Sequence, residues 1–452
     1  MVSAVLFITF FVLLVLNVPI SVCLGLSSAA AILYSGTSLT IVATNIYSGI
    51  SKFLLLAIPF FVLSGNIMAK AGISTRLIRF VDTCVGHRKG GIANVCIIVA
   101  CFFGAISGSG PATVAALGAV LIPAMIERGG FSVAFSTALM ATSSSIAIVI
   151  PPSIAFVVYA SITGVSIGDM FMAGIIPGIL MGLALVVVVM LEVRRNHVVP
   201  SNVEKASAKE RWNAFKDAFW GFLMPVIILG GIYGGIFTPT EAAAVSVVYG
   251  LFVGMIIYKE VKFKDLWEIL IDSAKTTGGI MLIVACASLF SFVCTRFGIS
   301  TAASELLARV AGNQFTFLLI CNIIFLIAGC FIDANSAMYI FIPIMLPVCK
   351  ALGYNVIAFG IMATVNLAIG QVTPPVGVNL FVAIGIKLRD GIRVTLQEIS
   401  RAVVPMVAAS IVVLLIITYI PQISTCLPAA LGSSAAIENG ETAGGDSGTT
   451  QT

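Results

Sequence analysis

The sequence carries little charge for its length. Charged residues make up 10% of its 452 positions, and it contains only two histidines and three tryptophans. A soluble domain has about 25% charged residues, so this composition excludes an ordinary soluble globular protein. Hydrophobic residues reach 59% instead, and the mean hydropathy is +1.13. We therefore expect an all-α polytopic membrane protein with about ten to thirteen helices that cross or enter the bilayer, at roughly 20 apolar residues per crossing.

Groups for catalysis are also scarce. The ten cysteines form no CxxC motif and have no spacing to histidine that suits a metal, and His87 and His197 both lie in charged loops. Intramembrane enzymes need acid, base or metal groups at membrane depth, and neither paired carboxylates nor a serine–histidine arrangement is evident. No targeting peptide is expected at the amino terminus, because the first basic side chain is Lys52. We expect neither an enzyme nor a bound organic cofactor.

An internal repeat is the most informative feature that is present. The segment KAGIST at 70–75 returns as RFGIST at 296–301. Gly130 lies 21 residues before a Pro-Pro pair at 151–152, and Gly353 lies 21 residues before a second pair at 374–375. The chain therefore contains two related copies of one structural unit.

The distribution of Lys and Arg indicates how the copies are oriented. Six basic residues follow the first copy between positions 194 and 216, whereas its internal loop at 161–172 has none. In the second copy the corresponding internal loop holds Lys387, Arg389, Arg393 and Arg401, and the tail at 421–452 has none. Because Lys and Arg accumulate on the cytoplasmic side, equivalent loops face opposite sides of the membrane. This pattern predicts an inverted-topology repeat, which is typical of secondary transporters.

Two breaks interrupt the apolar runs of the first copy. The stretch GAISGSGPAT at 104–113 is rich in glycine, and Pro111 suits the first turn of a new helix capped by Ser109 or Gly110. The amides of such a helix end would point at an anion. At the second break, near 150–153, two prolines remove the donors of preceding carbonyls. Na⁺, water or serine hydroxyls are the partners that could satisfy those carbonyls.

The second copy repeats both breaks with different residues. GCFIDANS at 329–336 ends one apolar run and begins another, with Asp333 or Asn335 as cap. TPPVGVN at 373–379 frees the carbonyls of Gly370 and Gln371. For Asp333 a capping role and a role in binding substrate or cation both remain open. Glu241, after Thr238, is expected to cap a helix.

These features divide the chain into five segments. They are leading membrane helices at 1–52, a first repeat at 53–193, a polar segment with two further helices at 194–276, a second repeat at 277–421, and a disordered tail at 422–452. Helical hairpins are expected near 104–127 and 329–350, and broken helices near 150–153 and 373–379. The polar stretch 194–217 fits either an amphipathic helix at the membrane surface or a solvated linker.

Four motifs give the sequence a family resemblance. They are LLLAIPFFVLSGNIMAKAGIS at 54–74, SGSGPATVAALG at 107–118, GIFTPTEAAAVSVVYG at 235–250 and NLAIGQVTPPVGVNLFVA at 366–383. The chain resembles the large membrane subunit of tripartite ATP-independent periplasmic (TRAP) transporters over about residues 1–421. The resemblance implies an elevator-type transporter, in which a transport domain with two re-entrant hairpins slides against a scaffold. It also implies Na⁺-coupled import of a small organic anion such as a C4-dicarboxylate or sialic acid, across the bacterial inner (cytoplasmic) membrane.

The resemblance also implies partners and site residues. The expected partners are a small four-helix membrane subunit, a periplasmic substrate-binding protein and the lipid bilayer, with no nucleic acid. Many members of the family have an Ala-Asp pair after the first Ser-Gly-Ser, where this chain has Gly110 and Pro111. The expected substrate-binding residues are Ser107, Ser109, Ser153 and Asp333, and the expected sodium-binding residues are Ser107, Gly108, Asn335, Gly370, Thr373 and Gly377.

Two other classes of protein are alternatives to a transporter. An intramembrane enzyme would act without a solute gradient, but the sequence offers few groups for it. An ion channel would place rings of ligands on an axis between subunits, whereas the repeat places the candidate ligands inside one chain. The sequence therefore favours a transporter.

Overall fold

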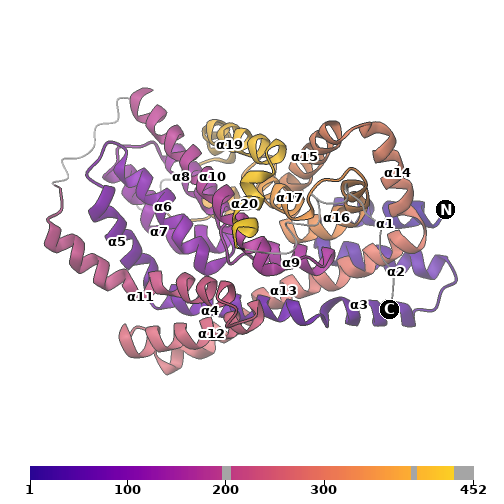
Figure 1. Ribbon diagram of the computed structural model, residues 1–452, viewed down its shortest axis with the longest axis horizontal. Coiled ribbons are helices and arrows are strands. Elements are labelled where there is room, and N and C mark those ends of the chain that lie inside the picture. The colour runs from indigo at the N-terminus through magenta and orange to yellow at the C-terminus, as the bar shows by residue number, and fades with distance from the viewer. Residues whose placement is uncertain (196–204, 388–393, 432–452) are drawn as a thin grey trace, which may run out of the picture.

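The computed structural model describes residues 1–195, 205–387 and 394–431, and within them all the regular elements are helices (Figure 1). Nine helices of this described part are long and apolar enough to cross a membrane, and six further apolar helices have 10–17 residues. The all-α architecture expected from the composition is confirmed.

The helices follow the same order in both copies of the repeat. The first copy consists of α4 (Ala57–Lys70), α5 (Ile73–Val85), α6 (Gly91–Ser107), α7 (Gly110–Glu127), α8 (Val133–Ser145), the short η2 (Ile146–Ile148), α9 (Ile154–Thr163) and α10 (Ile167–Arg195). The second consists of α13 (Phe263–Arg296), α14 (Ile299–Ala311), α15 (Gln314–Phe331), α16 (Ala334–Ala351), α17 (Val356–Gly370), α18 (Val378–Ile384) and α19 (Leu396–Tyr419). The equivalent helices α5 and α14 lie at opposite ends of the molecule (Figure 1), as an inverted arrangement requires.

The remaining helices surround these copies. They are α1 (Val2–Val15), α2 (Ile20–Tyr34), α3 (Thr40–Ile50), η1 (Phe53–Leu56), α11 (Ala208–Tyr233), α12 (Pro239–Leu251), η3 (Phe252–Ile257) and α20 (Gln422–Ala430). Both α2 and α3 pack along α13, and α12 packs along α4. The expected capping role of Glu241 is confirmed, because its carboxylate and Thr238 form a capping box at the start of α12.

The polar segment and the tail depart from the sequence expectation. Residues 208–217 form the first turns of α11, which continues unbroken to Tyr233, instead of a separate surface helix. A capping box between Ser207 and Glu210 starts this helix. The expectation of a disordered tail from 422 is wrong for α20, which packs against α10 and α17 and buries Ser424 and Pro428. The rest of that tail, 432–452, lies outside the described residues.

The two broken helices form the centre of the molecule. Within α17 the residues from Ile357 to Gly370 are all buried, and α8 is buried from Phe135 to Ser145. The Tyr159 ring of α9 lies against Gly360 of α17, where a side chain would collide with it, and the Tyr159 hydroxyl donates to the Val356 carbonyl at 2.6 Å. Glycine at this position therefore permits direct contact between the two copies.

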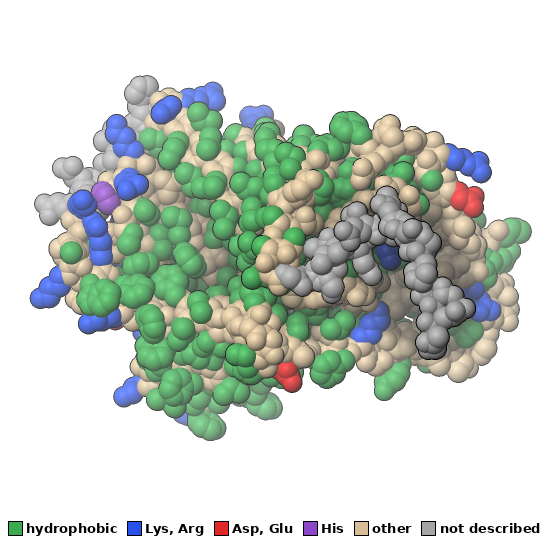
Figure 2. Space-filling view, viewed as in Figure 1, with side chains coloured by type: hydrophobic (Ala, Val, Ile, Leu, Met, Phe, Trp, Pro, Cys, Tyr) green, Lys and Arg blue, Asp and Glu red, His purple; other side chains and the backbone are tan. Residues whose placement is uncertain are grey.

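Charge and hydrophobicity are separated along the molecule. Figure 2 shows Lys and Arg side chains gathered at the end that holds α5, with hydrophobic side chains over the middle. Since basic residues accumulate on the cytoplasmic side, this end is assigned to the cytoplasm.

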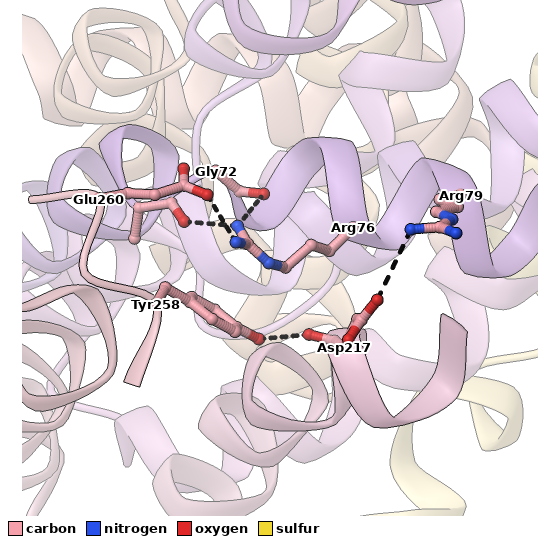
Figure 3. Close-up of polar contacts among 7 residues, drawn as sticks. Gly72, Arg76, Arg79, Asp217, Tyr258 and Glu260 are labelled. Carbon is pink, nitrogen blue, oxygen red and sulfur yellow. Dashed lines mark hydrogen bonds and ion pairs between the residues drawn. The ribbon is translucent and has the colours of Figure 1, made fainter. Parts of the chain in front are cut away.

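Helix α5 is joined to its neighbours by a network around Arg76 (Figure 3). The Arg76 guanidinium pairs with Glu260 at 2.5 Å, donates to the carbonyls of Ala71 and Gly72, and lies 3.9 Å from the centre of the Tyr258 ring. Burial raises the pKa of Tyr258 to about 12, so its hydroxyl keeps its proton and donates to the Asp217 carbonyl of α11 at 2.6 Å. The network thus fixes α5 to α11 and to the segment after η3.

Replacing Arg76 with alanine is expected to lower the free energy of unfolding by about 1–3 kcal/mol, because several partners lose their donor at once. Thermal unfolding in detergent measures this loss. Arg79→Ala on the same helix is the matched control, because Arg79 is 70% exposed and 3.7 Å from Asp217. Its loss is expected to be about 0.5 kcal/mol or less. Equal losses in the two variants would contradict the role of Arg76.

Candidate functional site

The tip of the first hairpin joins α6 to α7. Gly108 has φ +60°, a conformation that favours glycine, and it reverses the chain between Ser107 and Ser109. The Ser107 and Thr113 hydroxyls lie 2.9 Å apart, and the Thr113 hydroxyl donates to the Ser109 carbonyl at 2.8 Å. Ser109 is the N-cap residue of α7 as predicted, but its side chain makes no capping hydrogen bond. The amino-terminal end of α7 is therefore not capped by a side chain.

The second hairpin tip has the same plan with a different cap. Asp333 is the N-cap residue of α16, in the position that Ser109 takes at α7. Its carboxylate accepts from the amides of Asn335 and Ser336 at 3.0 and 3.2 Å, and from the Ser336 hydroxyl. A negative charge from the chain itself thus occupies this helix end, whereas the equivalent end at the first tip has none.

Each hairpin touches the broken helix of its own copy through small residues. A Cβ on Gly104 would lie 2.7 Å from the Cα of Ala147, and a Cβ on Gly370 would lie 2.5 Å from the Cα of Gly329. The amide of Gly377 also donates to the Cys330 carbonyl at 3.4 Å. The backbones of hairpin and broken helix are therefore in direct contact in both copies.

Most of the carbonyls that lose a donor to the prolines accept a hydrogen bond from another group nearby. In the first, Ser153 caps α9, is fully buried, and donates its hydroxyl to the Ile148 carbonyl at 2.5 Å. In the second, the Gly370 carbonyl accepts from the Thr373 amide and the Gln371 carbonyl from the Asn379 amide, both at 3.0 Å. The Thr373 hydroxyl donates to the Ile369 carbonyl at 2.7 Å. Its oxygen lone pairs remain available to a ligand.

Among the carboxamide oxygens without a hydrogen-bond partner in the described residues, three lie at the second tip and the second break. They belong to Asn335, Gln371 and Asn379 and are buried. A Cβ on Gly110 would lie 2.9 Å from the Gln371 oxygen and 3.0 Å from the Asn379 oxygen. Glycine at the start of α7 thus leaves room for two neutral oxygens beside the first hairpin tip.

A cavity of about 100 Å³ lies between the first tip and two helices outside the hairpins. Ser107, Ser109 and Ala112 line it from the hairpin. Gly65 and Asn66 of α4 and Thr276 of α13 line it from the opposite side. The uncapped end of α7 therefore faces an open volume.

The residues of α4 and α13 at this cavity were not predicted as site residues. A Cβ on Gly65 would lie 3.2 Å from the Cα of Ser107, so α4 packs tightly on the tip. The Asn66 amide donates to the Ser273 hydroxyl of α13 at 2.8 Å. The available signal was a polar side chain inside an apolar run, since Asn66 lies in the motif that carries the resemblance.

The structure brings together some of the predicted residues. Ser107 and Ser109 line the cavity, and Gly108 forms the turn between them. Ser153 is buried beneath the cavity with its neighbour Ile154 in the wall, and Asp333 lies at the other tip. Gly370, Thr373 and Gly377 lie together at the second break, next to the second hairpin.

The overall fold resembles that of solved membrane transporters. The structure resembles that of the YdaH transporter of Alcanivorax borkumensis with a TM-score of 0.59, over 87% of this chain and 88% of that one, at 14% sequence identity. At this identity the likeness concerns the fold alone. This chain therefore shares the polytopic membrane fold of that transporter.

Sequence comparisons identify the family. The family model described as "Tripartite ATP-independent periplasmic transporter, DctM component" matches residues 7–423. The C4-dicarboxylate TRAP transporter large permease proteins DctM of Pseudomonas aeruginosa and Rhodobacter capsulatus are 41% and 38% identical, over 91% and 93% of this chain and 95% and 97% of theirs. The isethionate TRAP transporter permease protein DctMQ of Oleidesulfovibrio alaskensis is 40% identical over 93% of this chain and 65% of its own length. This chain belongs to the DctM family of TRAP transporter large permeases and is a multi-pass protein of the bacterial inner membrane.

The contact between Gly370 and Gly329 makes a stability prediction. Gly370→Ala is expected to destabilise the protein by about 1–3 kcal/mol, because the added methyl group must push the hairpin away from α17. The matched control is Gly279→Ala in α13, where a Cβ meets nothing within 4 Å. Alanine there is expected to stabilise the helix by up to about 1 kcal/mol. Thermal unfolding measures both, and a gain in stability for Gly370→Ala would contradict the contact.

Proposed function

We propose that this chain forms the membrane pathway of a Na⁺-coupled importer of a small organic anion. The relatives are named for C4-dicarboxylate and for isethionate. A carboxylate and a sulfonate share a negative charge and several acceptor oxygens. We therefore propose a site for the anionic group of the solute. The cavity and the binding protein select the rest of the molecule.

The single observation that carries the proposal is the uncapped end of α7 at the cavity. Backbone amides at a helix start and the positive end of the helix dipole favour an anion. Ser109 adds a hydroxyl donor at the same place, and the Ser107 hydroxyl, which donates to Thr113, lies beside it. At the equivalent end of α16 the carboxylate of Asp333 takes the place of such an anion. The first tip therefore supports binding of the solute's acidic group.

Neutral oxygens beside the tips support a sodium site. A hard monovalent cation suits carbonyl, hydroxyl and carboxamide oxygens. Thr373 offers a hydroxyl oxygen, Asn335 a buried carboxamide oxygen without a partner, and Gly370 and Gly377 lie in the same break. Together with Ser107 and Gly108 at the first tip, these residues are our candidates for Na⁺.

The size of the cavity supports movement of the hairpins against α4 and α13. At about 100 Å³ it is smaller than ordinary ligand pockets, which hold about 300–1,000 Å³. Binding an organic anion there requires the tip to separate from Gly65 and Asn66. This is consistent with an elevator-type mechanism, with re-entrant hairpins and broken helices in a transport domain and with α4 and α13 in the scaffold.

The partners follow from family membership. A periplasmic binding protein delivers the solute, and a small four-helix subunit completes the membrane complex. The name DctMQ and the greater length of that relative support the second partner, since this chain spans only 65% of it.

The test of this function is solute uptake into proteoliposomes that hold the chain with its small subunit, with the loaded binding protein outside. Uptake is expected to need an inward Na⁺ gradient and to fall about tenfold in Ser109→Ala, because a hydrogen bond to a charged group is lost. Asp333→Asn is the companion variant, since asparagine caps a helix as well as aspartate does. Normal stability with reduced uptake would assign the Asp333 charge to transport, and unchanged uptake would leave it a cap. Uptake independent of Na⁺ would contradict the coupling.

Thr373→Val tests the sodium site at the second break. Removing the hydroxyl oxygen is expected to raise the Na⁺ concentration for half-maximal uptake by about threefold to tenfold. Thr373→Ser is the matched control because it keeps the hydroxyl, and it should retain the Na⁺ dependence of the unmodified protein. A lower maximal rate with an unchanged Na⁺ dependence would remove Thr373 from the site.

A further inference from the structure

A second and larger cavity is lined by other residues of α6 than the cavity at the first tip. It has a volume of about 440 Å³ and is bounded by α6, α10 and α11, and we refer to it as the α10/α11 groove. Of the described residues that line it, none bears a charged, hydroxyl or carboxamide side chain. Ile179 and Leu183 on α10 and Val226 on α11 are 52%, 55% and 62% exposed at its rim. The groove is therefore open on the side that faces the lipid.

The groove lies at the depth in the bilayer where a lipid tail ends. Its α6 residues run from Ile97 to Ala105, while α6 starts at Gly91. At about 1.5 Å per residue this places the groove about 9–21 Å from the start of the helix. Half of the hydrocarbon core measures about 15 Å. An acyl chain of the leaflet on that side thus ends inside the groove.

The ends of the same three helices are basic on that side. Arg88 and Lys89 precede α6, Arg194 and Arg195 end α10, and Lys209 and Arg211 begin α11. The carboxylates among these helix ends are Glu192 and Glu210, and Glu210 is engaged in capping α11. The buried Nε of Arg211 has no hydrogen-bond partner within the described residues. Among the described residues, positive charge therefore predominates where the head group of a lipid in the groove would lie.

We propose that the α10/α11 groove binds one anionic phospholipid, with an acyl chain in the cavity and its phosphate among the basic helix ends. Basic residues at the cytoplasmic ends of membrane helices attract anionic head groups. Packing of the tail gives little preference for one lipid over another, because the bilayer is as apolar as the groove. Selectivity comes from the head group.

The chemistry of the site favours a lipid over a protein helix as occupant, because an anionic lipid matches both the apolar lining of the groove and the basic helix ends. Gly182 and Ala105 are the small residues of its lining, which α6, α10 and α11 supply together with the first break. A chain of methylene groups suits this apolar lining.

The groove lies between the first break and α11. Ile150 and Pro151 of the first break line it from one side, and α11, which is fixed to α5, lines it from the other. A lipid held there contacts both the broken helix and α11. We therefore expect one molecule of anionic lipid to bind per protein chain.

Native mass spectrometry of the detergent-purified chain tests the proposal, with dioleoyl phosphatidylglycerol and dioleoyl phosphatidylcholine as probes. We expect one phosphatidylglycerol to be retained in preference to phosphatidylcholine. Leu183→Trp, which fills the groove, should abolish this preference, whereas Leu191→Trp should keep it, because Leu191 is 58% exposed on the same helix but does not line the groove. Lys209→Gln combined with Arg211→Gln should weaken phosphatidylglycerol binding by about tenfold or more.

The control for charge is Lys262→Gln combined with Lys264→Gln, which removes the same charge at the start of α13, away from the groove. It should leave binding unchanged. Equal binding of the two lipids, or full binding by Leu183→Trp, would overturn the proposal. So would crosslinking of the small subunit to Leu183→Cys, which would make a protein helix the occupant. Size-exclusion chromatography confirms folding, and if Leu183→Trp does not fold, the comparison of the two charge variants decides. The readout is independent of solute uptake.

Discussion

The requirement that every backbone polar group inside a membrane find a partner shapes this structure. Prolines at both breaks remove donors, and the chain answers locally, with the Ser153 hydroxyl on the Ile148 carbonyl and the Asn379 amide on the Gln371 carbonyl. Irregular backbone is tolerated at this depth only where protein or a cavity surrounds it. The fully buried α8 and α17 supply that surrounding. The candidate ligand oxygens therefore lie at the centre of the molecule and away from lipid.

The two copies use one backbone plan for different tasks. Glycine lets the hairpin touch its broken helix in both, at Gly104 and at Gly329. The caps differ, because Asp333 closes the end of α16 with its own charge and Ser109 leaves the end of α7 open beside a cavity. Of the two equivalent helix ends, that of α7 therefore suits an anion, and that of α16 is already neutralised by the Asp333 carboxylate. The difference rests on a single side chain at equivalent positions.

The outer surface adds a second level of organisation. The Arg76 network fixes α5 to α11 at the cytoplasmic end (Figure 3). The α10/α11 groove lies between α11 and the first break. Lipid in that groove and anion at the hairpin tip would contact opposite faces of the same broken helix, since Ile150 lines the groove and Ile154 lines the cavity. The bilayer is in this view a ligand of the transporter as well as its solvent.

The sequence alone predicted the membrane class, the repeat and the breaks, because these depend on composition and on spacing along the chain. It left two candidates for each cap, and the structure places Ser109 and Asp333 in these positions. The sequence predicted the polar segments less well. Residues 208–217 belong to α11, because the helix continues through them, and 422–430 form α20, because packing against α10 outweighs local composition. Only the tertiary structure decided that Asn66 and Thr276 line the cavity at the first tip and that the Ser153 hydroxyl binds the Ile148 carbonyl instead. The cavity joins residues far apart in the chain, and their distances depend on how helices pack, which no local pattern encodes.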